Sequence, residues 1–297
     1  MGVGIPSGFP PARVADVAIR DERIAAIEEN LSDSADHVID TEGKIVASGF
    51  IDIHTHSNFI LPSNPKAEGK IRQGVTTEVV GNCAFSVAPE LPEKVEVLRR
   101  YLSVSAPWLP VEETNFAEYI DAWPDLAVNT IMQVVHNTLR LMAMRILVRC
   151  MSKEDVRRIA SEPTATVGSD GPCVSPYGVT GQGKPHPRLY GTFPRLIGRY
   201  ARDLGLLTLP QALHKMTGMA ATALGLVDQG VLREGFASDV GVFDADGIID
   251  EATFDEPHTY PSGIVAVIVN VVQVVDGEHH TDALPGHLLR RRGSALQ

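Results

Sequence analysis

The chain lacks a long hydrophobic run. Its longest strongly apolar stretch, Gly263–Val275, has thirteen residues and includes Asn270 and Gln273, whereas a membrane-spanning helix needs about 20 apolar residues. The first residues, Met1–Pro11, also lack the basic patch and the apolar stretch of a secretory signal. The sequence therefore predicts no membrane-spanning segment and a cytoplasmic location.

Positive charge is also scarce. The 297 residues include 26 Lys and Arg against 37 Asp and Glu, which gives a formal net charge of −11. Nucleic acid and anionic membrane surfaces repel a protein with this average field, so neither is expected as a partner. The hydrophobic share of 44% and the charged share of 21% are typical of a folded globular protein.

Cysteine is the third scarce residue type. The chain has only Cys83, Cys150 and Cys173. An odd number of widely spaced cysteines in a chain of this length does not fit the small proteins that disulfides hold together. We therefore expect free thiols, one of which is a candidate metal ligand.

The order of apolar segments divides the chain into three zones. Between residues 49 and 225, apolar runs alternate with helical segments, which is typical of βα units around a parallel sheet. Strand-like segments flank this zone, at 14–19, 23–27, 38–39 and 45–46 before it and at 239–244, 264–269 and 271–275 after it. The sequence thus predicts an α/β protein, with a βα domain at 49–230 and a small β-domain built from 1–48 and 231–288.

Three helix starts are marked by capping residues. A Ser, Thr or Asn side chain accepts a hydrogen bond from a backbone N–H three residues later, where an acidic or amide side chain reinforces the turn. The pairs are Asn115 with Glu118, Ser152 with Asp155, and Thr208 with Gln211. Each pair predicts a helix that begins just after its first member.

A His-x-His pair ends the first apolar strand of the central zone. Residues i and i+2 of a strand project from the same side, so His54 and His56 can reach one ion together. Neutral imidazole is a common zinc ligand, although the pair also fits two surface histidines at a strand end. The preceding strand is apolar on both faces, as buried parallel strands are, and this favours the metal site.

Two further polar residues follow predicted strands. Cys83 ends the strand that starts at Gly74, and Asp170 follows the expected strand Thr164–Val167. A lone cysteine is more often a small buried residue than a ligand, and an aspartate here can be a turn residue or a helix cap. In a parallel barrel, however, catalytic groups gather at the carboxyl ends of the strands. The four side chains together therefore predict a metal site.

Several segments resemble the amidohydrolase superfamily, and within it the N-acyl-D-amino-acid deacylase (D-aminoacylase) family. GKIVASGFIDIHTHSN resembles the start of the superfamily barrel. The segments that resemble the deacylase family are GVTTEVVGNCAFSVAP, GSDG, PHPRLYGTFPR, MTGMAATALGL and GVLREGFASDVGVFDADGIIDEAT. The resemblance covers most of the chain, from about Ala15 to Arg291.

The resemblance implies a (β/α) barrel of the TIM type with a small β-sandwich domain built from both chain termini. It also implies zinc-dependent hydrolysis of a small-molecule N-acyl-D-amino acid to a carboxylate and a free D-amino acid. His54, His56 and Cys83 match the family's zinc ligands. Asp170 matches its acid/base residue, which can also contact a metal, and Arg188 matches its anchor for the substrate α-carboxylate. A structural ion pair is the alternative for Arg188.

The chain departs from the family in the middle of the barrel. In the family, a long stretch with two further zinc-ligand histidines lies between the segments matched by 127–140 and 151–171, and only residues near 142–150 join them here. His136 belongs to a different family segment and does not replace those histidines. The central zone, residues 49–225, is also shorter than the roughly 200 to 250 residues of a complete barrel. We therefore expect an incomplete barrel, whose exposed edge strands favour a homo-oligomer or aggregation.

Two functional classes follow from this departure. The first is a compact deacylase that holds zinc through His54, His56, Cys83 and Asp170. The second is a catalytically inactive, internally deleted remnant that binds at most one metal ion or needs a partner chain. The two missing histidines are the feature that separates them. Four protein ligands leave no open position for water, which is typical of a structural zinc site.

Overall fold

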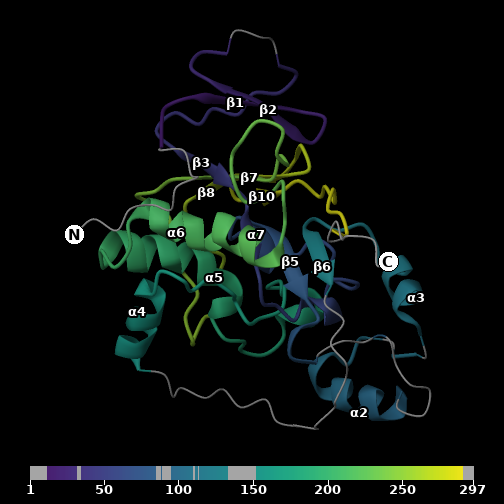
Figure 1. Cartoon of the computed structure of the whole chain (residues 1–297). Helices are drawn as coiled ribbons and strands as arrows, with labels where there is room; N and C mark the ends of the chain where they lie inside the picture. Colours follow the sequence, from purple (N-terminus) through teal and green to yellow (C-terminus); the bar gives the residue numbers. More distant parts are fainter. Residues whose placement is uncertain are drawn as a thin grey trace.

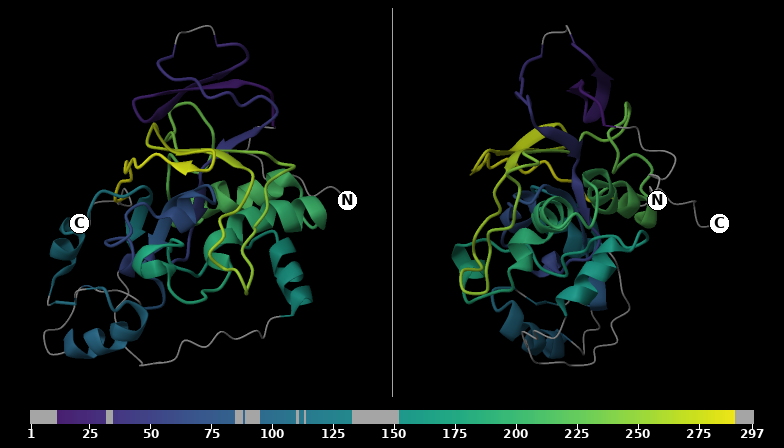
Figure 2. Two further views of the ribbon diagram at one scale, coloured as in Figure 1. Left: turned by 180° about the vertical axis from the view of Figure 1, so that it is seen from behind. Right: turned by 90° about the vertical axis from the view of Figure 1, so that its left-hand side faces the viewer.

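The computed structural model describes residues 12–31, 35–84, 88, 95–109, 111–112, 114–132 and 152–289. Cys150, His136 and the joining segment 142–150 lie outside the described residues. Figures 1 and 2 show a hairpin of the N-terminal strands at one end of the molecule and helix α2 (Val95–Ser105) at the opposite end.

A three-stranded parallel sheet lies at the centre of the βα zone. Its order is β4 (Phe50–Asp52), β5 (Val75–Val80) and β6 (Asn129–Met132), and both pairs of neighbours are parallel. Every residue of β4 and β5 is buried, as expected for parallel strands covered on both faces. The α/β class predicted from the sequence is confirmed. The described residues contain no closed barrel, and the barrel interpretation of this sheet stays a prediction.

Helices cover this sheet. Helices α6 and α7 pack against β4, and α1 packs against β5. The described residues include the helices α1 (Glu68–Ile71), α2 (Val95–Ser105), α3 (Phe116–Asp121), α4 (Lys153–Ser161), α5 (Arg188–Arg195), the π-helix η5 (Leu196–Asp203), α6 (Leu209–Met216) and α7 (Gly218–Leu224). The three predicted caps are confirmed, because α3, α4 and α6 begin directly after their capping residues, and α3 and α6 carry a complete capping box.

A second sheet joins strands from the two ends of the chain. It contains β3 (Ile45–Ser48) beside β7 (Val240–Phe243), followed by β8 (Ile264–Val269), β9 (Val272–Asp276) and β10 (His279–His280), all antiparallel. β1 (Asp16–Arg20) and β2 (Arg23–Glu28) form a separate hairpin. The expected union of both chain ends in one sheet is thus observed, while the β-sandwich and the domain boundaries stay predictions.

Two expected strands are absent from the structure. Residues 38–39 form no strand, and the Val38 side chain is 77% exposed, so no neighbouring strand covers it. Residues 164–167 also form no strand. The Ala165 N–H instead donates to the carbonyl of the preceding Glu162 in a turn, and the Ala165 carbonyl accepts a hydrogen bond from the Lys215 ammonium group. A turn and a side chain therefore satisfy backbone groups that a strand neighbour would otherwise bind.

The C-terminal segment 286–289 covers the outer edge of β6. The Thr130 N–H donates to the His287 carbonyl, and the Leu289 N–H donates to the Thr130 carbonyl, each at 2.9 Å. Leu288 thereby pairs with Thr130 as a parallel strand would. An edge with satisfied backbone groups is less prone to pair with another chain. The predicted homo-oligomer or aggregation rests on exposed edge strands, and this contact reduces the exposed edge. The oligomeric state stays a prediction.

The turn between β8 and β9 has an unfavourable residue. Asn270 (φ 47°) and Val271 (φ 71°) both adopt the left-handed conformation, as in a two-residue type I′ hairpin turn, which prefers Asn-Gly. A β-branched residue at positive φ is strained. The sequence shows the same departure, because Val271 follows Asn270 at the position where the glycine of an Asn-Gly turn is expected.

Val271→Gly is expected to raise the free energy of unfolding by about 1 kcal/mol, since relief of the strain exceeds the extra entropy of the unfolded chain. Urea denaturation measures the change. The matched control is Gly277→Ala, because Gly277 has φ 54° and an added Cβ would have no atom within 4 Å. This variant is expected to lose about 1 kcal/mol. A Val271→Gly variant no more stable than the wild type would contradict the strain argument.

Candidate metal centre

The two histidines lie just beyond the end of β4. The backbone N–H of the intervening Thr55 donates to the Val79 carbonyl at 3.0 Å, so this segment continues along β5. Thr55 is buried, whereas the side chains of His54 and His56 are 38% and 17% exposed. Their ring centroids are 5.5 Å apart. The strand alternation predicted from the sequence thus brings both imidazoles to the same side.

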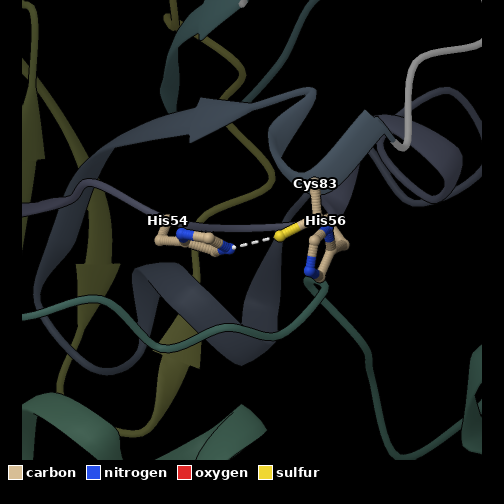
Figure 3. A group of neighbouring side chains, drawn as sticks. All are labelled: His54, His56 and Cys83. Carbon is tan, nitrogen blue, oxygen red and sulfur yellow. Dashed lines mark hydrogen bonds between the residues drawn. The ribbon is translucent and has the colours of Figure 1, made fainter. Parts of the chain in front are cut away.

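Cys83 reaches the same place from the end of β5. Its Sγ atom lies 3.3 Å from Nε2 of His54, and Figure 3 shows these two side chains pointing toward each other, with His56 beside them. One potential ligand atom from each of the three residues lies within 4.8 Å of the other two. Cys83 has φ 56°, a left-handed conformation that is strained for a non-glycine residue and occurs preferentially at functional sites.

Asp170 lies opposite the histidines. Its Oδ1 atom is 3.0 Å from Nε2 of His56 and 3.6 Å from Nε2 of His54. Its Oδ2 atom is 3.1 Å from Nη1 of Arg188, at the start of α5. The structure therefore brings together all five residues that the sequence predicts for the site. Arg188 is 42% exposed and Asp170 is 51% exposed, so this ion pair faces solvent.

The donor set fits zinc. Zn–N distances of about 2.0–2.1 Å and Zn–S distances of about 2.3 Å place the ligand atoms of a tetrahedral site about 3.3–3.6 Å apart. The separations from His54 to Cys83 and to Asp170, and from His56 to Asp170, are 3.3, 3.6 and 3.0 Å. The two imidazoles and the thiol therefore form a set that fits one ion, and the Asp170 carboxylate approaches the two imidazoles.

The local environment adjusts the protonation of two of these residues. Burial lowers the pKa of His56, against the opposing effect of the Asp170 carboxylate. The neutral imidazole, which is the form that binds metal, is therefore favoured. Burial, with the charge of Asp170, raises the pKa of the Cys83 thiol. The thiol form is therefore favoured without metal, and a metal ion that bound Cys83 as a thiolate would release its proton.

A buried group of charged side chains lies beneath these residues, and no sequence pattern predicts it as part of the site. Asp52, Lys70 and Glu78 are each 0% exposed. The Lys70 Nζ atom is 2.8 Å from Oδ2 of Asp52, and the Ser57 hydroxyl donates to the Glu78 carboxylate. The only local signal was the occurrence of charged residues within otherwise apolar strands, because nothing in the sequence shows that Lys70 approaches them.

Residues 111–275, more than half of the chain, match the Amidohydrolase family. The chain belongs to this family. The chain is 44% identical to N-acyl-D-aspartate deacylase of Alcaligenes xylosoxydans xylosoxydans over 47% of this chain and 26% of the relative. It is 42% identical to N-acyl-D-glutamate deacylase of the same organism over 48% of this chain and 28% of the relative. These matches thus span about a quarter of either relative.

The match to D-aminoacylase of the same organism extends over both chains. It has 26% identity over 476 positions and covers 98% of this chain and 96% of the relative. Because this chain has 297 residues, a large internal part of the relative has no counterpart here. The resemblance to the deacylase family and the internal deletion are therefore confirmed.

Solved structures agree with this fold. A crystal structure of D-aminoacylase has a TM-score of 0.71 at 24% identity, with 95% of this chain and 97% of that chain covered. N-acyl-D-glutamate deacylase from Bordetella bronchiseptica, complexed with zinc and a phosphonate inhibitor, has a TM-score of 0.70 at 24% identity, with 95% of this chain and 96% of that chain covered.

Among the described residues of our chain, no helix has the length and apolar character needed to cross a membrane.

Proposed function

We propose that this protein is a zinc-dependent amidohydrolase that hydrolyses N-acyl-D-amino acids to a D-amino acid and a carboxylate. The observation that carries the proposal is the convergence of His54, His56 and Cys83, with Asp170 opposite them. The deacylase names of two relatives above 40% identity support the substrate class. The zinc-bound deacylase structure of the same fold supports the choice of metal.

His54, His56 and Cys83 would hold the zinc ion. Three protein ligands are typical of catalytic zinc sites, in which the fourth position is open. The chemistry supplied by zinc at such a site is Lewis acidity, which polarises the amide carbonyl and lowers the pKa of a water molecule.

Asp170 would transfer the proton from the attacking water to the leaving nitrogen of the substrate. Its carboxylate is at hydrogen-bond distance from His56 and is half exposed, so it can accept a proton from water and return it to the leaving nitrogen. Arg188 would bind the α-carboxylate of the substrate, because a planar guanidinium binds a carboxylate through two hydrogen bonds. In the structure Arg188 pairs with Asp170, so an incoming carboxylate shares or replaces that partner.

Asp170 as a fourth metal ligand is the basis of the alternative function. The separations of 3.0 and 3.6 Å to the two histidines fit a closed tetrahedral site. Such a site would be structural, and the chain would then be the inactive remnant. The two functions therefore differ in whether Asp170 leaves the metal free to bind water.

The test is release of free D-amino acid from N-acetyl-D-aspartate, N-acetyl-D-glutamate and neutral N-acetyl-D-amino acids, with and without added zinc. We expect zinc-dependent turnover that falls by about 10²- to 10⁴-fold in Asp170→Ala, the typical range for loss of a general acid or base. Asp282→Ala is the matched control, because Asp282 is an exposed aspartate that pairs with Lys66 away from the site. A folded protein that binds zinc stoichiometrically but releases no D-amino acid would overturn the deacylase function and favour the alternative.

A further inference from the structure

A buried carboxylate connects the two segments that carry the site. Asp52 is the last residue of β4 and is 0% exposed. Its Oδ1 atom accepts the backbone N–H of His54 at 3.3 Å and the backbone N–H of Ser169 at 3.0 Å. One carboxylate oxygen therefore holds the strand end with the histidines against the turn with Asp170.

Lys70 completes this connection from a third element, α1. Its Nζ atom is fully buried, lies 2.8 Å from Oδ2 of Asp52 and donates to the Ser169 hydroxyl. A buried ammonium group requires both an opposite charge and hydrogen-bond acceptors, and Asp52 and Ser169 supply these. Ser169 is itself 2% exposed, so water cannot easily replace its hydroxyl group.

The turn held in this way has a strained conformation. Asp170 has φ 49°, a conformation that costs about 1–2 kcal/mol for a residue with a Cβ. Its side chain is 51% exposed, so packing does not hold it. The backbone is held instead, because the Asp170 N–H donates to the His54 carbonyl at 2.9 Å. The approach is close, since a Cβ added at Gly168 would lie 2.8 Å from the Cβ of His54.

We propose that Asp52, Lys70 and Ser169 form a buried clamp that places the Asp170 carboxylate beside His54 and His56, where its charge and its hydrogen bond to His56 favour a metal ion held by His54, His56 and Cys83. None of the three would contact the metal ion, and each acts through the turn that carries Asp170. The proposal rests on the zinc site of the proposed function. It goes beyond that function because it assigns the placement of Asp170 to charges that lie beneath the site.

The test compares Ser169→Ala with Ser175→Ala. The first variant removes only the hydroxyl that Lys70 contacts and leaves the Ser169 N–H bond to Asp52 in place. Ser175 is a similarly buried serine, at 3% exposure, whose hydroxyl bonds to Thr180 instead. Zinc affinity is measured by competition with a chromogenic chelator, and the absorption spectrum of the Co²⁺-loaded protein reports the coordination geometry.

We expect Ser169→Ala to bind zinc about 10- to 100-fold more weakly, as is usual for loss of a group that orients a ligand, and to show altered cobalt d–d bands. Ser175→Ala is expected to retain the wild-type affinity and spectrum. Asp170→Ala provides the second comparison. If Ser169 acts through Asp170, adding Ser169→Ala to Asp170→Ala produces no further loss of affinity, as a double-mutant cycle requires.

Wild-type affinity and an unchanged cobalt spectrum in Ser169→Ala would overturn the clamp. A loss of the same size in the Asp170→Ala background would also overturn it, because Ser169 would then act by another route. A wild-type protein without a thiolate-to-cobalt band would remove the metal site and the clamp together. Zinc binding without turnover would overturn the deacylase function alone, and the clamp would still be decided by the affinities.

Discussion

Lys70→Met is expected to lower the free energy of unfolding by about 3–5 kcal/mol, the usual loss when one partner of a buried ion pair is removed. The methionine side chain fills most of the lysine volume, so the loss is electrostatic. Asp52 would remain as a fully buried charge without its cation, and the Glu78 carboxylate would lose the nearby positive charge that lowers its pKa. Urea denaturation with a chelator in every sample measures the change without a contribution from bound metal.

The chain provides a matched control for this variant. Lys66 pairs with Asp282 on the surface, where the two side chains are 39% and 70% exposed, and exposed pairs contribute about 0–1 kcal/mol. Lys66→Met should therefore lose less than about 1 kcal/mol. The double variant Asp52→Asn/Lys70→Met removes both charges and should recover part of the loss. Equal losses in Lys70→Met and Lys66→Met would contradict a stabilising role of the buried pair.

Local sequence signals predicted the residues of the candidate site. Alternation along a strand brings His54 and His56 to one side, and this geometry needs only the two-residue repeat of an extended chain. Cys83 was predicted to join them because parallel neighbouring strands end at the same edge of a sheet, and β4 and β5 are such neighbours. The helix starts predicted from capping residues were confirmed for a similar reason, since a cap and its partner are only three residues apart in the sequence.

Features that depend on distant residues could not be predicted in this way. Lys70 and Asp52 are close in sequence, but Ser169 reaches them from 99 positions beyond Lys70. The prediction of a strand at 164–167 was wrong because a turn forms there, in which Lys215 binds the Ala165 carbonyl, and no local pattern indicates that lysine. The cover of β6 by 286–289 likewise depends on the path of the whole chain. Local patterns therefore predicted the candidate ligands, whereas the residues that support them became visible only in the tertiary structure.

The second large effect concerns pH, because two fully buried carboxyl groups have raised pKa values. Burial raises the pKa of Glu78 from 4.5 to about 7, against the opposing effects of Lys70 and Ser57. Burial also raises the pKa of Asp239 from 3.8 to about 7, although Asn270 and Asn129 donate hydrogen bonds to it. Both groups favour the protonated form in the folded protein more strongly than in the unfolded chain.

The sign of the effect follows from this difference. Between pH 4 or 5 and pH 7, the folded protein retains protons that the unfolded chain has released, so raising the pH favours unfolding. We expect the free energy of unfolding to fall across this window, by an amount on the order of 3 kcal/mol for each group, and to level off above about pH 7. Urea denaturation at a series of pH values, with a chelator present, measures the slope.

Two substitutions test whether Glu78 and Asp239 cause the dependence of the free energy of unfolding on pH. Glu78→Gln retains an acceptor for the Ser57 hydroxyl and cannot ionise, so the dependence on pH should fall by about half. Asp239→Asn should remove a similar part, and the double variant should become slightly more stable as the pH rises from 5 to 7, because burial lowers the pKa values of His56, His214 and His280. At pH 8, Glu78→Gln should be more stable than the wild type, because it avoids the buried charge that the wild type must then carry. If Glu78→Gln and Asp239→Asn left the dependence on pH between 5 and 7 unchanged from that of the wild type, the inferred direction of both shifts would be wrong.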